Sequence, residues 1–432
     1  MSDFASYTHG TAYKRIRDSN AVDGTQAIIL AGGSGSRLKS LTRWHSKPAV
    51  PFGGKYKSID FPLSNCINSK IRKISILTQY KSHSLNMHIN QGWNFLKPEL
   101  GEFIDLVPAQ QRVREDWYQG TADAVYQCMD IIREHSPKLV LILAGDHIYK
   151  MDYGRMIHEH LDSGAEMTIG CIEVDLKEAK QFGVLSADYK NNVIEFTEKP
   201  ANPNPCAHNP GKALASMGIY VFHSDFLYDQ LAKDASSQTS SHDFGKDIIP
   251  GLIGNTHVNA YCFRDDETGE PGYWRDVGTI DAYYEANMAL CDVTPPLNLY
   301  DKTWPIMSYQ EQLPPAKFVF NDPGRRGSAN DSLISSGCII SGSTVDRCLV
   351  FNNVRVNSFG ELKDSVILPN VVIGRNCKIQ KAIIDRDCNI PSGTTIGFDI
   401  NEDRKRFYVS ENGIVLVSAE MLDGKPGNAA DL

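Results

Sequence analysis

The sequence predicts an α/β protein in which a doubly wound, Rossmann-like domain is followed by a left-handed parallel β-helix. Two observations support this fold class. Over about the first 300 residues, short apolar runs alternate with helical segments, as in a mostly parallel sheet covered by helices. Beyond residue 318, isoleucines recur six residues apart, a period that neither a helix nor a single strand produces.

A chain of 432 residues is long enough for two domains. We place the first at residues 1–300, a proline-containing linker at 301–317 and the β-helix at 318–432. No apolar run is long enough to span a membrane, and the N-terminus lacks the apolar core of a signal peptide. The ten cysteines include no Cys-x-x-Cys pair, so we expect reduced thiols in a cytoplasmic protein without a membrane partner.

The first domain is expected to open with a buried strand at Ala27–Leu30, followed by a helix at Phe61–Ser69. A second helix should begin at Thr121, whose hydroxyl can cap it. Its apolar stripe consists of Ala122, Val125, Met129 and Ile132. Further strands are expected at Ile74–Thr78, Leu139–Ala144, Met167–Glu173, Val193–Thr197, Ala215–Phe222 and Val258–Phe263.

The second domain is expected to be built from hexapeptide repeats. The repeated isoleucines are Ile334 and Ile340, then Ile367, Ile373 and Ile379, then Ile384, Ile390 and Ile396. The step between the second and third groups is five residues, and the middle coil, around residues 351–362, is expected to be irregular. Because a β-helix exposes an end coil, we expect this domain to serve in assembly.

A glycine-rich turn, Gly32–Gly35, follows the first strand directly. Such a turn presents backbone N–H groups to phosphate oxygens. It is not a dinucleotide fingerprint, because Leu38 stands where the third glycine belongs, and it is not a P-loop, because Arg37 stands where Gly-Lys is required.

The charge around this turn favours a polyanionic ligand. Between residues 24 and 98 the only acidic residue is Asp60, whereas eleven lysines and arginines lie there. Because the whole chain carries a net charge of −8, this excess is local and can attract an anionic substrate. Nucleic acid is disfavoured as a partner, since the chain is acidic overall and has no basic stripe with interleaved aromatic residues.

The string from Gly32 to Lys47 resembles the signature of the sugar-nucleotide pyrophosphorylases. Further strings are similar to the bacterial ADP-glucose branch, namely Leu38–Thr42, Trp117–Ala124, Ala144–Tyr149, Ser241–Asp247 and Tyr273–Thr279. The resemblance implies an enzyme that forms ADP-glucose and diphosphate from ATP and glucose 1-phosphate, for glycogen synthesis. It also implies a homotetramer that requires Mg²⁺ and responds to anionic metabolites.

In the pattern of this family, Asp146 and Asp276 hold Mg²⁺, and Arg37 and Lys47 neutralise the phosphates. Joining two phosphates requires positioning and charge neutralisation more than a protein nucleophile, and such residue types supply both. From the residues alone, Asp146 can equally be a helix cap and Asp276 a salt-bridge partner of Arg275.

The resemblance also implies substrate contacts. Those to the nucleotide are Leu30, Gly32, Gly33, Gly35, Tyr118 and Gly120. Those to glucose 1-phosphate are Tyr118, Gly183, Glu198, Lys199, Ser216 and Asp243. Taken singly, each of these residues can instead belong to a turn, a close-packed strand or a solvated surface.

Regulation is where the sequence departs from its relatives, many of which place several lysines and arginines just before the Lys-Pro string. This chain has Arg43, Trp44 and His45 there, and Lys57 and Arg386 are expected to complete an effector site at the domain junction. With fewer cations, weak activation by fructose bisphosphate or a preference for another anion is expected. Because His45 titrates near neutrality, the response should strengthen between about pH 8 and 6.5. Alternatively, the segment is an ordinary surface turn whose Trp44 packs on the neighbouring domain.

Three other functions are weighed against this interpretation. A pyrophosphorylase for another nucleotide or sugar would use the same residues. Hexapeptide acyltransferases commonly use a histidine base, but residues 318–432 contain no histidine. A regulatory subunit with a degraded site is disfavoured because all five charged site residues are present, namely Arg37, Lys47, Asp146, Lys199 and Asp276.

Overall fold

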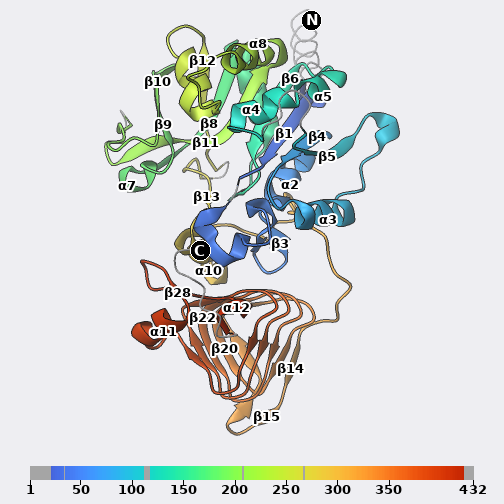
Figure 1. The fold of residues 1–432 in the computed structure, drawn as a ribbon, viewed down its shortest axis with the longest axis vertical. Coiled ribbons are helices and arrows are strands. Elements are labelled where there is room, and N and C mark those ends of the chain that lie inside the picture. Colours follow the sequence, from blue (N-terminus) through green and yellow to red (C-terminus); the bar gives the residue numbers. More distant parts are fainter. Residues whose placement is uncertain (1–20, 34, 111–116, 207–208, 266–267, 423–432) are drawn as a thin grey trace, which may run out of the picture.

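A computed structural model describes residues 21–33, 35–110, 117–206, 209–265 and 268–422. An α/β lobe and a β-helix lie end to end along the long axis of the molecule (Figure 1). Ser34, inside the predicted glycine-rich turn, falls outside the described residues. Within the described part of the chain, no helix has the length and apolar character needed to cross a membrane.

The α/β lobe is organised around a nine-stranded sheet that contains every strand expected there. Its strands are β1 (Thr25–Ala31), β4 (Lys73–Thr78), β5 (Phe103–Pro108), β6 (Leu139–Ala144), β8 (Met167–Asp175), β9 (Gly183–Ala187), β10 (Val193–Glu198), β11 (Lys212–His223) and β12 (Val258–Cys262). The order β10-β9-β11-β6-β1-β4-β5 places β1 near the middle, where Ile28 and Ile29 are fully buried. Both faces of β1 are covered, which is why its sequence is continuously apolar.

The predicted α/β class is confirmed, and the sheet is mixed. Strands β1, β4, β5 and β6 run parallel, whereas β11 is antiparallel to β6, β8 and β9. Strand β11 is buried over most of its length. A strand covered on both faces shows an apolar run in either direction, so its sequence does not reveal the reversal.

The helices that cover the sheet include α2 (Asp60–Asn68), where a helix was expected. The helix expected from Thr121 is two helices, α4 (Thr121–Gln127) and α5 (Met129–Glu134), separated at Cys128. Thr121 does not cap α4, because Gly120 holds the cap position and the Thr121 hydroxyl donates to Asp243 at 2.9 Å. The remaining helices of the lobe are α3 (His83–Gly92), α6 (Tyr153–Ser163), α7 (Leu176–Ala179), α8 (Ser224–Ala235), α9 (Ile249–Leu252) and α10 (Ile280–Met288).

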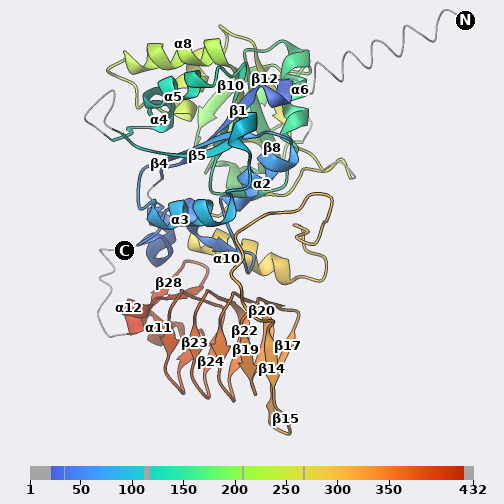
Figure 2. The same cartoon turned by 90° about the vertical axis from the view of Figure 1, so that its right-hand side faces the viewer.

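The second lobe is a parallel β-helix, seen from two sides in Figures 1 and 2. One face holds β14 (Lys317–Val319), β19 (Ile339–Ser341), β21 (Arg355–Val356), β23 (Val372–Ile373) and β26 (Asn389–Ile390). The other two faces hold β17 (Ser328–Asn330), β18 (Leu333–Ile334), β20 (Thr344–Val350), β22 (Glu361–Ile367), β24 (Lys378–Gln380), β25 (Ala382–Ile384), β27 (Thr395–Ile396) and β29 (Val415–Val417). A hairpin of β15 (Asn321–Asp322) and β16 (Arg325–Arg326) projects from its far end, and α11 (Ile400–Arg406), β28 (Tyr408–Val409) and α12 (Ala419–Leu422) close the described chain.

The central coils of the β-helix repeat every 17 residues, as the stacked pair Asn370 and Asp387 shows. Each coil has three sides, of which two contain six residues and the third contains five. This explains why Ile379 and Ile384 are five residues apart and the isoleucines within each group six. At the corner that shortens this third side, Asp364 adopts a positive φ of 43°. The expectation of an irregular middle coil is wrong, since Val356 and Leu362 fill the inward positions there and are buried.

One of the apolar clusters contains residues of both lobes and joins them. Helix α10 packs against β20 and β22, and the Tyr284 hydroxyl donates to the Asp364 carbonyl oxygen at 2.6 Å. Residues 292–316 contain no helix or strand and run along α2, where the indole N–H of Trp304 donates to Asn65 at 2.9 Å and the Ser308 hydroxyl donates to Asp60 at 2.7 Å. The boundaries placed at residues 300 and 317 stay a prediction.

Candidate active site

A short tertiary ribbon brings the two predicted metal-binding aspartates together. Strand β7 (His147–Tyr149) follows Asp146 directly and pairs antiparallel with β13 (Trp274–Asp276). In this register His147 lies opposite Asp276. The ribbon therefore joins two carboxylates that are far apart in the sequence.

Lys47 lies between these carboxylates. Its Nζ forms an ion pair with Asp146 and a hydrogen bond of 2.8 Å to Oδ1 of Asp276. Burial lowers the pKa of Lys47, but the attraction of Asp146 and Asp276 is larger and leaves that pKa raised. Burial opposes ionisation of Asp146 as well, yet the charges of Lys47 and His147 lower its pKa to about 2. Lys47 and Asp146 are therefore both ionised at neutral pH.

Arg37 stands at the solvent side of this ion pair. It belongs to the 3-10 helix η1 (Ser36–Thr42), and its Nη2 lies 3.9 Å from Oδ2 of Asp276. The Arg37 side chain is 59% exposed, in contrast to the buried Lys47. One cation therefore neutralises the aspartates, and the second remains accessible to an anionic ligand.

The glycine-rich turn lies at the same edge of the sheet. The backbone N–H of Gly145 donates to the Leu30 carbonyl oxygen at 3.0 Å, which ties the Asp146 loop to the end of β1. Gly35 has a φ of +67°, and a Cβ atom there would lie 2.9 Å from Thr42 and 3.2 Å from Cβ of Lys47. Gly33 faces open space, since a Cβ atom there would meet no described atom within 4 Å. Gly32 is closer to its neighbours, with Gln79 3.4 Å from such an atom.

Glu198 and Lys199 lie together where β10 ends. Gly183 is the cross-strand partner of Glu198, and a Cβ atom at Gly183 or Gly245 would come within 2.9 or 2.7 Å of the Glu198 carboxylate. The two glycines therefore make room for that side chain. Lys199 has a positive φ of 47°, its Nζ lies 3.3 Å from Glu198, and its side chain is 59% exposed. Backbone strain of this kind concentrates at functional sites.

The structure gives Asp243 and Ser216 local roles of their own. One oxygen of Asp243 caps the π-helix η4 (Phe244–Ile248) by accepting from two backbone N–H groups, and the other accepts from Thr121. Ser216 is buried and accepts from the N–H of Gly218 at 3.3 Å. Their predicted contacts with the sugar stay predictions.

Gly120 and Tyr118 lie before α4. A Cβ atom at Gly120 would lie 2.2 Å from the carbonyl oxygen of His242, so only glycine fits there. The hydroxyl of Tyr118 lies 3.2 Å from Sγ of Cys128, and burial raises the pKa of that hydroxyl. Close packing accounts for both residues, and their nucleotide contacts stay predictions.

Comparisons with known proteins identify the family of this chain. A family model described as nucleotidyl transferase matches residues 26–293, and one described as GlmU-like, C-terminal hexapeptide matches residues 314–417. The chain is 60% identical over 399 residues to glucose-1-phosphate adenylyltransferase of Hydrogenovibrio crunogenus, covering 92% of this chain and 94% of the relative. It is 59% identical over 402 residues to the glucose-1-phosphate adenylyltransferase of Nitrosococcus oceani, covering 93% and 95%. The chain belongs to the glucose-1-phosphate adenylyltransferase family.

Membership of the glucose-1-phosphate adenylyltransferase family confirms the predicted family and the order of its two folds, a nucleotidyltransferase domain followed by hexapeptide coils. Nucleotidyl transferases typically use a divalent metal ion. The donor set fits such an ion, because Asp146 and Asp276 offer carboxylate oxygens and already share one positive charge, the ammonium of Lys47.

Sequence reasoning missed two side chains near these sites. His147 joins Asp146 and Asp276 in a group whose ligand atoms lie within 4.8 Å of one another, and its place beside Asp146 was a visible signal. Glu420 contacts both Arg43 and Trp44, at 3.6 and 3.4 Å. No sequence pattern indicated that contact, because it joins the segment after η1 to α12 at the end of the β-helix.

The residues expected to bind an effector fall into two groups. Arg43 and Trp44 are engaged by Glu420, although Trp44 remains 69% exposed. His45, Lys57 and Arg386 are more buried and close enough to influence one another's charge. The structure therefore places effector-site candidates from both lobes together, with His45 and Lys57 from the α/β lobe beside Arg386 of the β-helix.

The expectation that His45 titrates near neutrality is wrong. Burial and the charges of Arg386, Lys57 and Lys81 lower the pKa of His45 to about 4, so the ring stays neutral between pH 8 and 6.5. Burial and Arg386 also lower the pKa of Lys57, to about 8, against the opposing attraction of Asp60. Lys57 therefore titrates in the physiological range.

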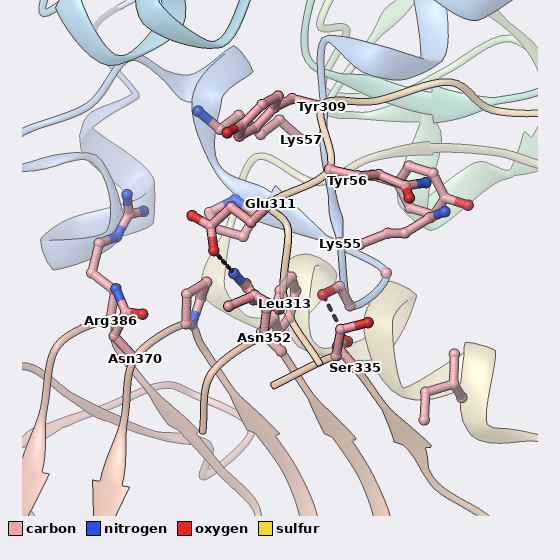
Figure 3. A pocket seen from close by; sticks show the side chains of 18 of the residues that line it. Lys55, Tyr56, Lys57, Tyr309, Glu311, Leu313, Ser335, Asn352, Asn370 and Arg386 are labelled. Carbon is pink, nitrogen blue, oxygen red and sulfur yellow. Dashed lines mark hydrogen bonds between the residues drawn. The ribbon is translucent and has the colours of Figure 1, made fainter. Parts of the chain in front are cut away.

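A cavity of about 1110 Å³ opens beside this group, between the lobes (Figure 3). Lys57 and Arg386 line it together with Glu311 of the linker and Asn352 of the β-helix, which are joined by a hydrogen bond of 2.8 Å. Nη2 of Arg386 is buried and has no hydrogen-bond partner among the described residues. Nε of Arg386 lies 3.7 Å from Oδ1 of the neighbouring Asp385, which leaves Nη2 for an anionic ligand.

Proposed function

We propose that this protein transfers the adenylyl group of ATP to glucose 1-phosphate and forms ADP-glucose and diphosphate for glycogen synthesis. The observation that carries the proposal is Lys47 held between Asp146 and Asp276, beside the glycine-rich turn, in a chain of this family. The ammonium of Lys47 can neutralise phosphate charge directly, and the two carboxylates can hold a metal ion that does the same.

In the proposed mechanism, a phosphate oxygen of glucose 1-phosphate attacks the α-phosphorus of ATP. The new P–O bond forms as the bond from the α-phosphorus to the bridging oxygen breaks, and diphosphate leaves with that electron pair. Arg37 and Lys47 neutralise charge on the triphosphate and on the departing diphosphate. Asp146 and Asp276 would hold Mg²⁺, which when bound supplies further charge neutralisation to phosphate oxygens.

Substrates are proposed to bind on either side of these charges. The ATP phosphates meet the backbone of Gly32, Gly33 and Gly35, which lies open at Gly33. The carboxylate of Glu198 accepts hydrogen bonds from hydroxyl groups of the sugar, and Lys199 binds the phosphate of glucose 1-phosphate. The strained, exposed position of Lys199 at the end of β10 supports this assignment.

A coupled assay of diphosphate release from ATP and glucose 1-phosphate tests the proposed function. Turnover with ATP well above turnover with UTP or dTTP is expected. Higher turnover with UTP or dTTP would make the protein a pyrophosphorylase for another nucleotide. Absence of turnover with every nucleotide would favour a regulatory subunit.

Replacing Lys199 with alanine should raise KM for glucose 1-phosphate and leave kcat nearly unchanged. A contact with the bound phosphate acts equally in the ground and transition states, so its loss affects binding. A charged hydrogen bond contributes about 1.5–3 kcal/mol, which corresponds to roughly a 10- to 150-fold rise in KM. Steady-state kinetics would measure it, with Lys190→Ala, in the turn between β9 and β10, as the control. A rise confined to KM for ATP would assign Lys199 to the other substrate.

The junction cavity is proposed to bind an anionic effector through Lys57 and Arg386. Because the pKa of Lys57 is about 8, its charge is present below that pH and is lost above it. Affinity for an anion such as fructose bisphosphate should therefore rise as pH falls from about 9 to 7. Activity titrations at each pH would measure this, and Lys57→Met should abolish the pH dependence, whereas Lys55→Met on the same cavity wall should retain it. A dependence unchanged in Lys57→Met would contradict the proposal.

The exposed indole of Trp44 stands where many relatives carry a cation. Activation by fructose bisphosphate is therefore proposed to be weak, with another anion preferred, and Trp44→Lys should strengthen it. Titration of both proteins with fructose bisphosphate, fructose 6-phosphate, pyruvate, AMP and phosphate tests this preference.

We further propose a cytoplasmic homotetramer assembled through the β-helix. Phe320 and Phe359 are each 42% exposed on this lobe, and the guanidinium of Arg325 lies over both rings. Exposed aromatic and arginine side chains are typical of protein interfaces. Light scattering of the full chain measures the number of subunits.

A further inference from the structure

We infer that His147 is a third ligand of the divalent ion, a nitrogen beside the carboxylates of Asp146 and Asp276. This inference rests on the metal site of the proposed function and adds a ligand of a different chemical class. A nitrogen ligand changes which ions the site prefers, so the inference concerns metal selectivity as well as binding.

The first support is the position of the three side chains. One ligand atom from each lies within 4.8 Å of the other two, and no other such group of three His, Cys, Asp or Glu residues occurs in the described chain. Nε2 of His147 lies 3.7 Å from Oδ1 of Asp146. Atoms bound to one ion at about 2.1 Å lie roughly 3 Å apart when adjacent and roughly 4 Å apart when opposite. Rotation of the two carboxylates toward Nε2 of His147, with Nζ of Lys47 displaced from between them, would close the three ligands around one ion.

The second support is the tautomer of the imidazole. Nδ1 of His147 lies 3.1 Å from the carbonyl oxygen of Met217, which can only accept a hydrogen bond. Nδ1 therefore carries the hydrogen in the neutral ring, and Nε2 keeps its lone pair on the side of Asp146. Metal-binding histidines are commonly oriented by this kind of hydrogen bond from the second ring nitrogen.

The third support is the fixed orientation of the ring. The buried indole of Trp274, on β13, meets the imidazole edge to face, with centroids 5.0 Å apart. On another side, Gly218 adopts a φ of +65°, and a Cβ atom there would lie 3.6 Å from Cε1 of His147. Strands β11 and β13 thus hold the ring from two directions, so that little rotational freedom is lost when a metal ion binds.

A site with one imidazole and two carboxylates should bind Mn²⁺ and Co²⁺ more tightly than Mg²⁺. Magnesium prefers oxygen ligands, whereas imidazole suits the transition metals. The expected order of affinity is therefore Co²⁺, then Mn²⁺, then Mg²⁺, and the differences should shrink when His147 is replaced by glutamine.

Pulsed electron paramagnetic resonance of bound Mn²⁺ provides the test. The full chain, labelled with ¹⁵N only in histidine, is loaded with Mn²⁺ in the presence of ADP-glucose, whose adenine nitrogens stay unlabelled. A ¹⁵N coupling of directly bound strength is expected, together with its loss in His147→Gln. That variant should also bind Mn²⁺ at least about 10-fold more weakly, since losing even an outer-shell partner of a metal ligand typically costs that much. His83→Gln, at an exposed position on α3, should keep both the coupling and the affinity.

The outcomes separate this inference from the metal site itself. Mn²⁺ binding that Asp276→Asn weakens but that shows no ¹⁵N coupling would keep the aspartate site and overturn the role of His147. Failure of Mn²⁺ to bind, or binding unaffected by Asp276→Asn, would overturn the aspartate site and the inference together. A coupling that persists in His147→Gln would assign the nitrogen to another histidine and also overturn the inference.

Discussion

Replacing Asp146 with asparagine should lower kcat by at least about 10²–10³, because the substitution removes a carboxylate that is proposed to hold Mg²⁺ in the transition state. The change is nearly isosteric, so the fold should survive. Circular dichroism and steady-state kinetics with ATP, glucose 1-phosphate and Mg²⁺ would measure both. The Mg²⁺ concentration needed for half-maximal activity should rise in the same variant.

Asp152→Asn is the matched control for this experiment. Asp152 lies six positions after Asp146 and caps α6 by accepting from the N–H of Gly154. Asparagine caps helices as well as aspartate does, so this variant should behave like the parent. Turnover of Asp146→Asn close to that of Asp152→Asn would refute the metal-binding role.

Replacing Lys47 with methionine should impair both stability and turnover. Methionine keeps much of the side-chain volume but leaves the carboxylates of Asp146 and Asp276 without their shared cation. Breaking a buried ion pair from one side typically costs about 3–5 kcal/mol of folding free energy. Mg²⁺ should restore part of that loss, because an ion that binds only the folded state stabilises it.

The pH dependence of Lys47→Met follows from the lowered pKa of Asp146. In the parent, Asp146 stabilises the fold above its ordinary pKa of about 3.9, and this contribution is lost as pH falls towards about 2. Without Lys47 the lowered pKa is no longer maintained, so acid should destabilise the variant less than the parent. Urea unfolding at several pH values and Mg²⁺ concentrations would measure this.

Lys212→Met is the control for Lys47→Met, since Lys212 pairs with Asp175 on the surface at 3.0 Å. A surface pair contributes at most about 1 kcal/mol. If Lys47→Met unfolded at the same urea concentration as Lys212→Met and retained normal turnover, the bridging role of Lys47 would be wrong.

The parts of the fold that the sequence predicted are those with local signals. β1 and β6 are apolar throughout because both faces are buried, and inward positions such as Ile373 and Ile379 mark the coils. The reversed direction of β11 and the break at Cys128 could not be predicted. Both depend on what packs against these segments and not on their own residue pattern.

In the candidate site, too, the local relationships could be predicted from the sequence and the tertiary ones could not. Arg37 and Lys47 share one sequence string, so their proximity was predictable, whereas the neighbours of Asp146 and Asp276 are set by a tertiary ribbon. The pH expectation for His45 failed because it used the pKa of a solvated imidazole. Burial next to Arg386, which comes from the other lobe, is not visible in the local sequence.

The ribbon of β7 and β13 also has a consequence for how the protein is made. Asp276 leaves the ribosome long after Lys47 and Asp146, and until it arrives Lys47 has only one of its two carboxylate partners. A nascent chain that ends before β13 can pair β1, β4, β5 and β6, yet it holds only one of the two carboxylates proposed to bind the metal ion. Contacts between distant segments form late and slowly. The scaffold is therefore expected to mature before the proposed catalytic centre, which is completed only once the chain has been synthesised past residue 276.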